Sequence, residues 1–314
     1  HALPTAGYIS VSVPSGSLTT FTTTLENISS ETGDISAGVV DSSSSNTITD
    51  SGANWTVDFH DSASLPQFLK LTSGLGEGTV FQITDSTATT LTVLVPSGFD
   101  ISSLISPGST TYVIINGETL DSLFESVSVL TGTDSVNADR VFLFNSSWSQ
   151  YYKNTSDVWQ REDPFGDVDA TGTVIKPGQG FIYAAQSGSS PTITTSGIVS
   201  TNDYSTIIVN GIGSNSFVSV GHPVDQTIES LGLESVLSGA NGEANQALAD
   251  KLFIYLSGSW RQFYYDTSSS LWTQDDPFGD FDATGTLIPS NTPILISKVG
   301  GSGTSVATVS NPIQ

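Results

Sequence analysis

The stretch EDPFGDVDATGT at residues 162–173 returns at residues 275–286 as DDPFGDFDATGT, with ten of the twelve positions identical. The likeness continues upstream of both loops, where it pairs residues 111–127 with 216–232 and residues 137–148 with 248–260. The chain therefore contains an internal duplication. Two copies are too few for an open solenoid, so we expect them to pack on each other with pseudo-twofold symmetry.

Alternation of apolar and polar residues, with many β-branched and aromatic side chains, predicts strands along most of the chain. The clearest examples are residues 8–13, 79–84, 90–95, 111–117, 141–144 and 217–221. Helices are predicted only at residues 119–130 and 227–237, each after a threonine suited to an N-cap. We expect an all-β, mainly antiparallel fold with two short helices. An N-terminal β-domain at 1–110 would precede an internally duplicated β-unit, with copies at 111–200 and 201–314.

The composition excludes several classes of function. The 314 residues include no cysteine and three histidines, which argues against thiolate chemistry and transition-metal sites. With 31 acidic and 8 basic residues the formal net charge is −23, so nucleic acid is not an expected partner. No apolar run is long enough to span a bilayer. No nucleophile elbow, zinc-protease or phosphate-loop pattern occurs, and we predict that the protein is not an enzyme.

The carboxylates of the repeated loop suggest a calcium site. In D-x-D-x-T-G, hard oxygen ligands alternate along the chain in a way that suits a cation with six to eight ligands. The candidate ligands are Asp163, Asp167 and Asp169 in the first copy and Asp276, Asp280 and Asp282 in the second. The alternative is a purely structural loop, in which the aspartates accept hydrogen bonds from nearby backbone N–H groups and the phenylalanine of Pro-Phe-Gly packs into the core.

Aromatic residues recur at the same positions of both copies. The matched set consists of Trp148, Tyr151, Tyr152 and Trp159 in the first copy and Trp260, Phe263, Tyr264 and Trp272 in the second. Exposed rings of this kind could stack on sugars, whereas buried rings would supply the core of a small β-unit. Four N-x-[ST] sequences are candidate glycosylation sites, at Asn27, Asn54, Asn145 and Asn154.

The combination of A-D-[RK]-[VL]-F, W-x-Q-[YF]-Y, a second tryptophan and a downstream Pro-Gly or Pro-Ser strand resembles a family of secreted, β-rich bacterial proteins of verrucomicrobial and planctomycete type. The resemblance covers roughly residues 75 to 298. It implies export and a cell-surface or extracellular setting, and it carries no catalytic residues. The chain begins with HALPTAGY and contains no methionine, which agrees with removal of a secretory signal peptide.

These observations predict a structural subunit of an extracellular filament, appendage or surface layer, whose main partner is itself. The alternative is a secreted carbohydrate-binding module that binds cell-surface glycans. For assembly, the candidate is the alternating strand formed by Tyr8, Ile9, Val11 and Val13 and their neighbours, which would leave its own domain and complete a sheet of the next subunit. Residues 304–310 could donate a strand in the same way. The simpler alternative is that Tyr8 to Val13 is the first strand of its own domain.

Overall fold

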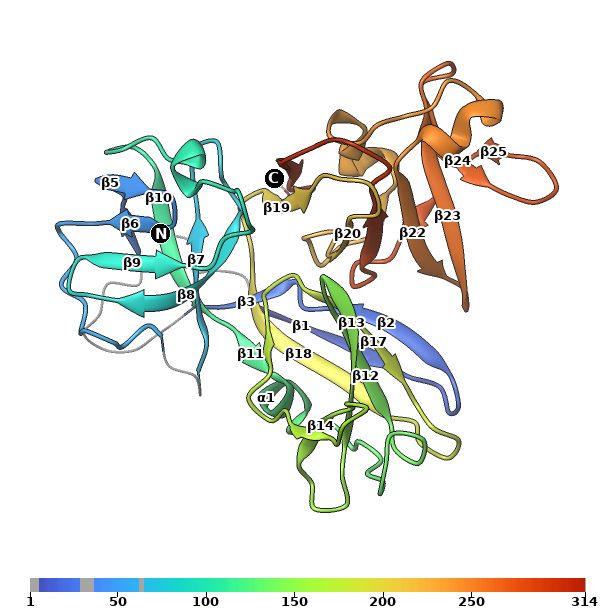
Figure 1. Ribbon diagram of the computed structural model, residues 1–314, viewed down its shortest axis with the longest axis horizontal. Helices are drawn as coiled ribbons and strands as arrows, with labels where there is room; N and C mark the ends of the chain where they lie inside the picture. Colours follow the sequence, from blue (N-terminus) through green and yellow to red (C-terminus); the bar gives the residue numbers. More distant parts are fainter. Residues whose placement is uncertain (1–5, 29–36, 62–64, 314) are drawn as a thin grey trace.

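The computed structural model describes residues 6–28, 37–61 and 65–313. It is 43% strand and 7% helical, and its sheets are antiparallel, so the predicted all-β fold is confirmed. Figure 1 shows three lobes, which we call the insert lobe, the first repeat and the second repeat. The insert lobe covers residues 37–116. The first repeat combines residues 6–28 with 117–199, and the second repeat covers residues 204–309.

Each repeat contains a six-stranded sheet with the same strand order. In the first repeat the order is β15 (Val168–Asp169), β14 (Trp159–Arg161), β13 (Ser147–Lys153), β12 (Arg140–Asn145), β17 (Gly180–Ala184) and β2 (Leu18–Thr22). In the second it is β25 (Phe281–Asp282), β24 (Leu271–Asp275), β23 (Ser259–Asp266), β22 (Lys251–Leu256), β27 (Ile294–Ser297) and β20 (Asn215–Val218). The two sheets therefore correspond strand for strand, with β2 in the place of β20.

Each repeat is closed by pairing between its first and last strands. In the first repeat β1 (Ala6–Ser12) pairs with β18 (Thr192–Val199), and in the second β19 (Tyr204–Val209) pairs with β28 (Thr304–Val309). Two smaller ladders also correspond, namely β11 (Glu118–Thr119) with β16 (Val174–Ile175), and β21 (Gln226–Thr227) with β26 (Leu287–Ile288). Each repeat has its own hydrophobic core beneath these strands.

The insert lobe separates the second strand of the first repeat from the rest of that repeat. Its elements, with the strand that leads into it, are β3 (Leu25–Ile28), β4 (Ala37–Val39), β5 (Ser42–Ser44), β6 (Thr47–Thr49), β7 (Gln67–Leu71), β8 (Val80–Ser86), β9 (Thr90–Val93), η1 (Ile101–Leu104) and β10 (Thr111–Asn116). Because β3 pairs with both β18 and β10, one ten-stranded sheet runs from β1 through the insert lobe to β5. The insert lobe has a separate core between Val40 and Ile114.

These pairings correct the expected domain boundaries. Strands β1 and β2 belong to the first repeat and not to an N-terminal domain at 1–110, while β10 belongs to the insert lobe and not to a repeat at 111–200. The likeness of residues 111–117 to 216–221 reflects the alternation common to half-buried strands. Hydrogen-bonding partners, which lie far away in the sequence, decide which sheet a strand joins.

The predicted helices are present but shorter than expected. Helix α1 (Leu120–Phe124) begins at an N-cap, Thr119, whose hydroxyl accepts a hydrogen bond from the Ser122 N–H at 3.1 Å. The second segment forms two 3-10 turns, η2 (Glu229–Leu231) and η3 (Leu233–Ser235), and a further 3-10 helix, η4 (Glu243–Leu248), follows. Gly232 ends η2 with a φ of 64°, a left-handed conformation that favours glycine.

In each repeat a buried aspartate lies directly before an equivalent strand, β12 or β22, and holds the loop there in place. In the first repeat, Asp139 is fully buried, and its carboxylate accepts hydrogen bonds from Tyr183 Oη (2.8 Å), Ser189 Oγ (2.6 Å) and the backbone N–H groups of Leu130 (2.9 Å) and Gln186 (2.8 Å). These four donors join the loop before β12 to the end of β17 and the segment that follows it. The A-D-[RK] motif of the sequence is therefore an anchor for β12.

The matching aspartate of the second repeat uses a charged partner. Asp250 accepts hydrogen bonds from the N–H groups of Ser238 (2.7 Å) and Val299 (2.9 Å), as Asp139 does from the equivalent positions. Its third partner is the ammonium group of Lys298, which is itself only 4% exposed. A buried ion pair thus replaces the tyrosine and serine hydroxyls of the first repeat.

Replacing Asp250 by alanine should destabilise the second repeat by about 3 to 5 kcal/mol, because the buried Lys298 ammonium loses its counter-charge. Urea unfolding would measure the change in the free energy of unfolding. The double variant D250A/K298M should be less destabilised than D250A alone, since no buried charge is left unpaired. A double variant as unstable as the single one would contradict this account.

Candidate functional site

The repeated acidic loop connects β14 to β15 and is shaped by its own aspartates. Asp163 Oδ1 accepts a hydrogen bond from the Phe165 N–H at 2.9 Å, and Asp167 Oδ1 accepts one from the Asp163 N–H at 3.3 Å. Asp169 Oδ1 accepts one from the Thr171 N–H at 3.0 Å. In the second repeat the equivalent bonds of Asp276, Asp280 and Asp282 measure 2.9, 3.2 and 2.9 Å. The aspartates therefore order the loop through local turns.

A tyrosine from the neighbouring strand anchors each loop. Tyr152 Oη donates a hydrogen bond to Asp167 Oδ2 at 2.5 Å, and Tyr264 Oη donates one to Asp280 Oδ2 at 2.7 Å. The bond to Asp167, helped by burial, raises the pKa of Tyr152 to about 12. Burial and the bond to Asp280 raise the pKa of Tyr264 in the same direction. Both phenols therefore hold their protons as donors to the loop.

The loops do not gather the carboxylates that a calcium site would need. Among the described residues, the three acidic side chains that come within 4.8 Å of one another are Asp58, Asp61 and Asp85 of the insert lobe, which the sequence analysis did not single out. The predicted ligand sets in the repeated loops do not form such a group, and each aspartate instead accepts a hydrogen bond from a backbone N–H of its loop. The structural alternative describes the loops better.

One part of that alternative was wrong. The phenylalanines of Pro-Phe-Gly do not pack into the core, since Phe165 is 99% exposed and Phe278 is 98% exposed. The adjacent Gly166 has a φ of 124°, a backbone conformation that favours glycine. The buried contacts of the loop are made instead by Ala170 and, in the second repeat, Ala283.

The aromatic residues divide into two groups with different environments. Tyr151, Tyr152, Trp159, Phe263, Tyr264 and Trp272 are buried. Trp148 and Trp260 are 41% and 39% exposed, at the start of the second strand of each β-hairpin. Only these two tryptophans of the predicted cluster are therefore available to a ligand, and the sequence pattern did not distinguish them from the buried ones.

An aromatic strip connects the two exposed tryptophans across the repeats. Trp148 lies 5.2 Å from the ring of Phe144 and 5.2 Å from that of Phe217, measured between ring centroids. Trp260 lies 6.4 Å from Phe217 and 5.4 Å from Tyr255. Phe217, on β20, thus joins the hairpin tips of the first and second repeats. Sequence reasoning missed Phe144, Phe217 and Tyr255 as members of this strip.

A cleft of about 430 Å³ lies where the three lobes meet. Its walls come from β8 and Leu94 and Pro96 of the insert lobe, from Phe144–Ser146 and Lys176–Gln179 of the first repeat, and from β19 and β20 of the second repeat. Its volume is within the range of small-molecule sites, which often lie between domains. None of the lining residues is acidic, and Lys176 is the one charged residue among them.

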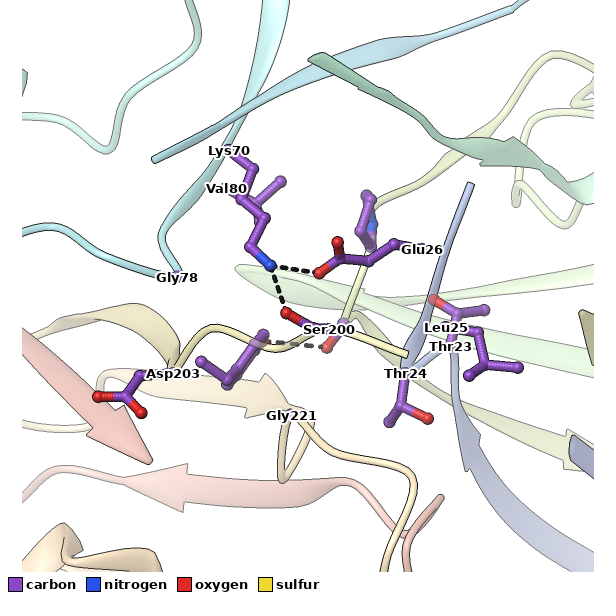
Figure 2. A pocket seen from close by; sticks show the side chains of 13 residues that line it. Thr23, Thr24, Leu25, Glu26, Lys70, Gly78, Val80, Ser200, Asp203 and Gly221 are labelled. Atoms are coloured by element: carbon purple, nitrogen blue, oxygen red, sulfur yellow. Dashed lines mark hydrogen bonds and ion pairs between the residues drawn. The ribbon is translucent and has the colours of Figure 1, made fainter. Parts of the chain in front are cut away.

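An ion pair ties the lobes together beside the cleft. Figure 2 shows Lys70 of β7 reaching Glu26 of β3, and its ammonium group also donates to Ser200 Oγ at 2.6 Å. Lys70 is only 2% exposed. The surrounding cavity, of about 20 Å³, has room for little more than one water molecule. This contact is therefore structural, since it joins the insert lobe to the first repeat and to the segment that leads to the second.

The candidate glycosylation sites differ in accessibility. Asn54 and Asn145 are exposed, whereas Asn154 is partly buried and its Oδ1 holds a turn by accepting from the N–H groups of Ser156 and Val158. Asn27 is part of β3, and its side chain lies outside the described residues. Modification of the asparagines stays a prediction.

No family model, curated protein or solved structure matches this chain. Within the part of the chain that the structure describes, no helix has the length and apolar character needed to cross a membrane. The function is therefore argued from the geometry of the chain's own residues.

The tyrosine anchors generate a pH-dependent prediction. Because Tyr152 keeps its proton to about pH 12 in the folded state, its contribution to stability is complete below its ordinary pKa of 10.0 and is lost as the pH rises from there to about 12. The Tyr152→Phe variant should lose less stability over that interval than the unmodified chain. Urea unfolding at successive pH values would measure this. Tyr8→Phe, at a position 77% exposed, is the control, and identical pH profiles for all three proteins would contradict the prediction.

Proposed function

We propose that the protein is a structural subunit of an extracellular filament, appendage or surface layer, and that subunits join by exchanging β1. The proposal rests on one observation. Strand β1 is the first described strand, and it is held by a single antiparallel ladder to β18, from Ala6 opposite Ile198 to Ser12 opposite Thr192. Among the described residues β1 pairs with β18 alone, so it can leave its place when that one ladder breaks.

One face of β1 fills the core and the other faces outward. Ile9 and Val11 pack partly buried against the core of the first repeat, and Val13 is buried in it. Tyr8, Ser10 and Ser12 are exposed on the opposite face. If β1 moved to a neighbouring subunit, the same side chains would fill the same core there, so exchange costs few contacts. The pairing of β1 with β18 of the same chain corresponds to the simpler alternative, in which Tyr8 to Val13 is the first strand of its own domain.

The equivalent strand of the second repeat is held more firmly. In β19, Ile208 is buried in the core of the second repeat, while Ile207 packs against the core of the insert lobe. Its partner β28, at residues 304–309, is held in the same two-sided way, with Ala307 and Val306 on opposite faces. Of the two predicted donor segments, β1 would therefore lose fewer packing contacts on leaving its own sheet.

The absence of charge around β1 also favours self-association. No charged residue occurs between residues 6 and 25 or between residues 177 and 202, the two segments that contain the ladder. In a chain with a net charge of −23, most other surfaces would repel a second copy. Charged residues are depleted from the centres of protein interfaces in general. A donor strand and acceptor without charge can pair where the rest of the surface would resist contact.

Head-to-tail exchange of this kind uses two different surfaces, so it can propagate as a filament in place of closing as a dimer. Non-enzymatic function and secretion are parts of the same proposal. They draw support from the Cys-free, Ser- and Thr-rich composition and from aspartates that serve as structural hydrogen-bond acceptors.

A disulfide engineered across the ladder tests the exchange directly, because the chain has no cysteine of its own. Ser10 and Thr194 face each other with their hydroxyl oxygens 2.5 Å apart. Val13 N–H bonds to Pro191 O within the ladder, so alternation makes Ser10 and Thr194 a non-hydrogen-bonded pair, with closely spaced side chains. In the variant S10C/T194C, oxidation of assembled protein should link neighbouring subunits into covalent multimers on a non-reducing gel.

Oxidation of dilute monomer before assembly should instead lock β1 in its own subunit and prevent polymer formation, as seen by negative-stain microscopy. Adding reductant should restore assembly. The single variants S10C and T194C control for the effect of each substitution. Polymers that yield only monomers after oxidation, or a locked monomer that still polymerises, would rule out exchange of β1.

A further inference from the structure

We propose that the cleft between the three lobes binds an uncharged glycan chain. This inference does not rest on the filament proposal, because it concerns a different surface and different residues. Two properties of the cleft carry it: its lining has hydrogen-bonding groups but almost no charge, and aromatic and aliphatic side chains form part of its walls.

The charge of the lining indicates the class of ligand. The whole chain carries 31 acidic residues, yet the cleft presents none and has Lys176 as its one charged lining residue. Its polar groups are the amides of Gln82, Asn145, Gln179 and Asn215 and a set of hydroxyls. Amides and hydroxyls both donate and accept hydrogen bonds, as sugar hydroxyl groups require. A cationic ligand would find no counter-charge here.

Two of the amides present complementary atoms. Asn145 Oδ1 accepts a hydrogen bond from Gln179 Nε2 at 3.2 Å, which orients the Asn145 amide group and leaves its two N–H donors on the exposed side chain. Asn215 Nδ2 donates to Gly213 O at 3.1 Å, which orients its Oδ1 as an acceptor. These two asparagines come from different repeats. A ligand that contacts both asparagines could accept hydrogen bonds from the two N–H groups of Asn145 and donate one to Asn215 Oδ1.

The apolar wall supplies a surface for the C–H face of a sugar ring. Phe144 of β12 and Phe217 of β20 line the cleft, together with Leu94 and Val209, which are 51% and 39% exposed. Phe144 and Phe217 both contact Trp148, so the wall continues into the aromatic strip. A cleft that offers both polar and apolar side chains suits a chain of sugar units, in which hydroxyl groups lie at the edges and C–H groups on the faces.

The test uses defined probes, namely neutral hexasaccharides of glucose, xylose, mannose and N-acetylglucosamine, with protein from a host that does not glycosylate. We expect at least one to bind in isothermal titration and to change tryptophan fluorescence through Trp148. Phe144→Ala and Asn215→Ala should each weaken that binding by about tenfold or more. Tyr255→Ala is the matched control, since Tyr255 occupies the position of Phe144 in the second repeat but does not line the cleft.

Failure of every hexasaccharide to bind would overturn the proposal, as would equal losses in the Phe144→Ala and Tyr255→Ala variants. Circular dichroism melting of each variant shows that a loss of binding is not a loss of fold. The oxidised S10C/T194C monomer separates the two proposals, because sugar binding should persist in it while assembly stops. If Asn215→Ala abolishes polymer formation and no sugar binds, the cleft accepts a strand of a second subunit instead.

Discussion

Pairing between the first and last strand of each repeat is the constraint on which the architecture depends. The β1–β18 and β19–β28 ladders join segments far apart in the sequence. Each repeat also contains a six-stranded sheet and a hydrophobic core of its own. Because the first and last strands of a repeat pair with each other, a longer segment between β2 and β11 does not disturb that pairing. The insert lobe occupies that position in the first repeat, and the second repeat has only a short connection there.

Because of the insert lobe, the β1–β18 and β19–β28 ladders have different surroundings. In the second repeat, the β19–β28 pair is covered on one face by its own core and on the other by the insert lobe, through Ile207 and Val306. In the first repeat, the outer face of β1–β18 carries small hydroxyl residues, such as Ser10 and Thr194, that face solvent. The Lys70–Glu26 pair fixes the insert lobe in place, so the difference between the ladders is built into the fold.

The same arrangement creates the cleft. Its walls come from three lobes, and the residues that line it are separated by well over a hundred positions in the chain. The aromatic strip also combines residues of different lobes, since Phe217 contacts two hairpin tips whose tryptophans are equivalent in sequence. The two repeats carry matching side chains, and their packing brings these side chains to a shared location that neither repeat has alone.

Local patterns in the chain were enough to predict the β-class, the likeness of the two copies and the start of α1, because alternation, repetition and a threonine N-cap act over short distances. Alternation also predicted the strand that contains Ile9, Val11 and Val13. It could not assign β1 and β2 to the first repeat, expose Phe165 or separate Trp148 from the buried Trp159. Strand partners and exposed faces depend on which distant segments pack together, so they could be assigned only from the folded chain.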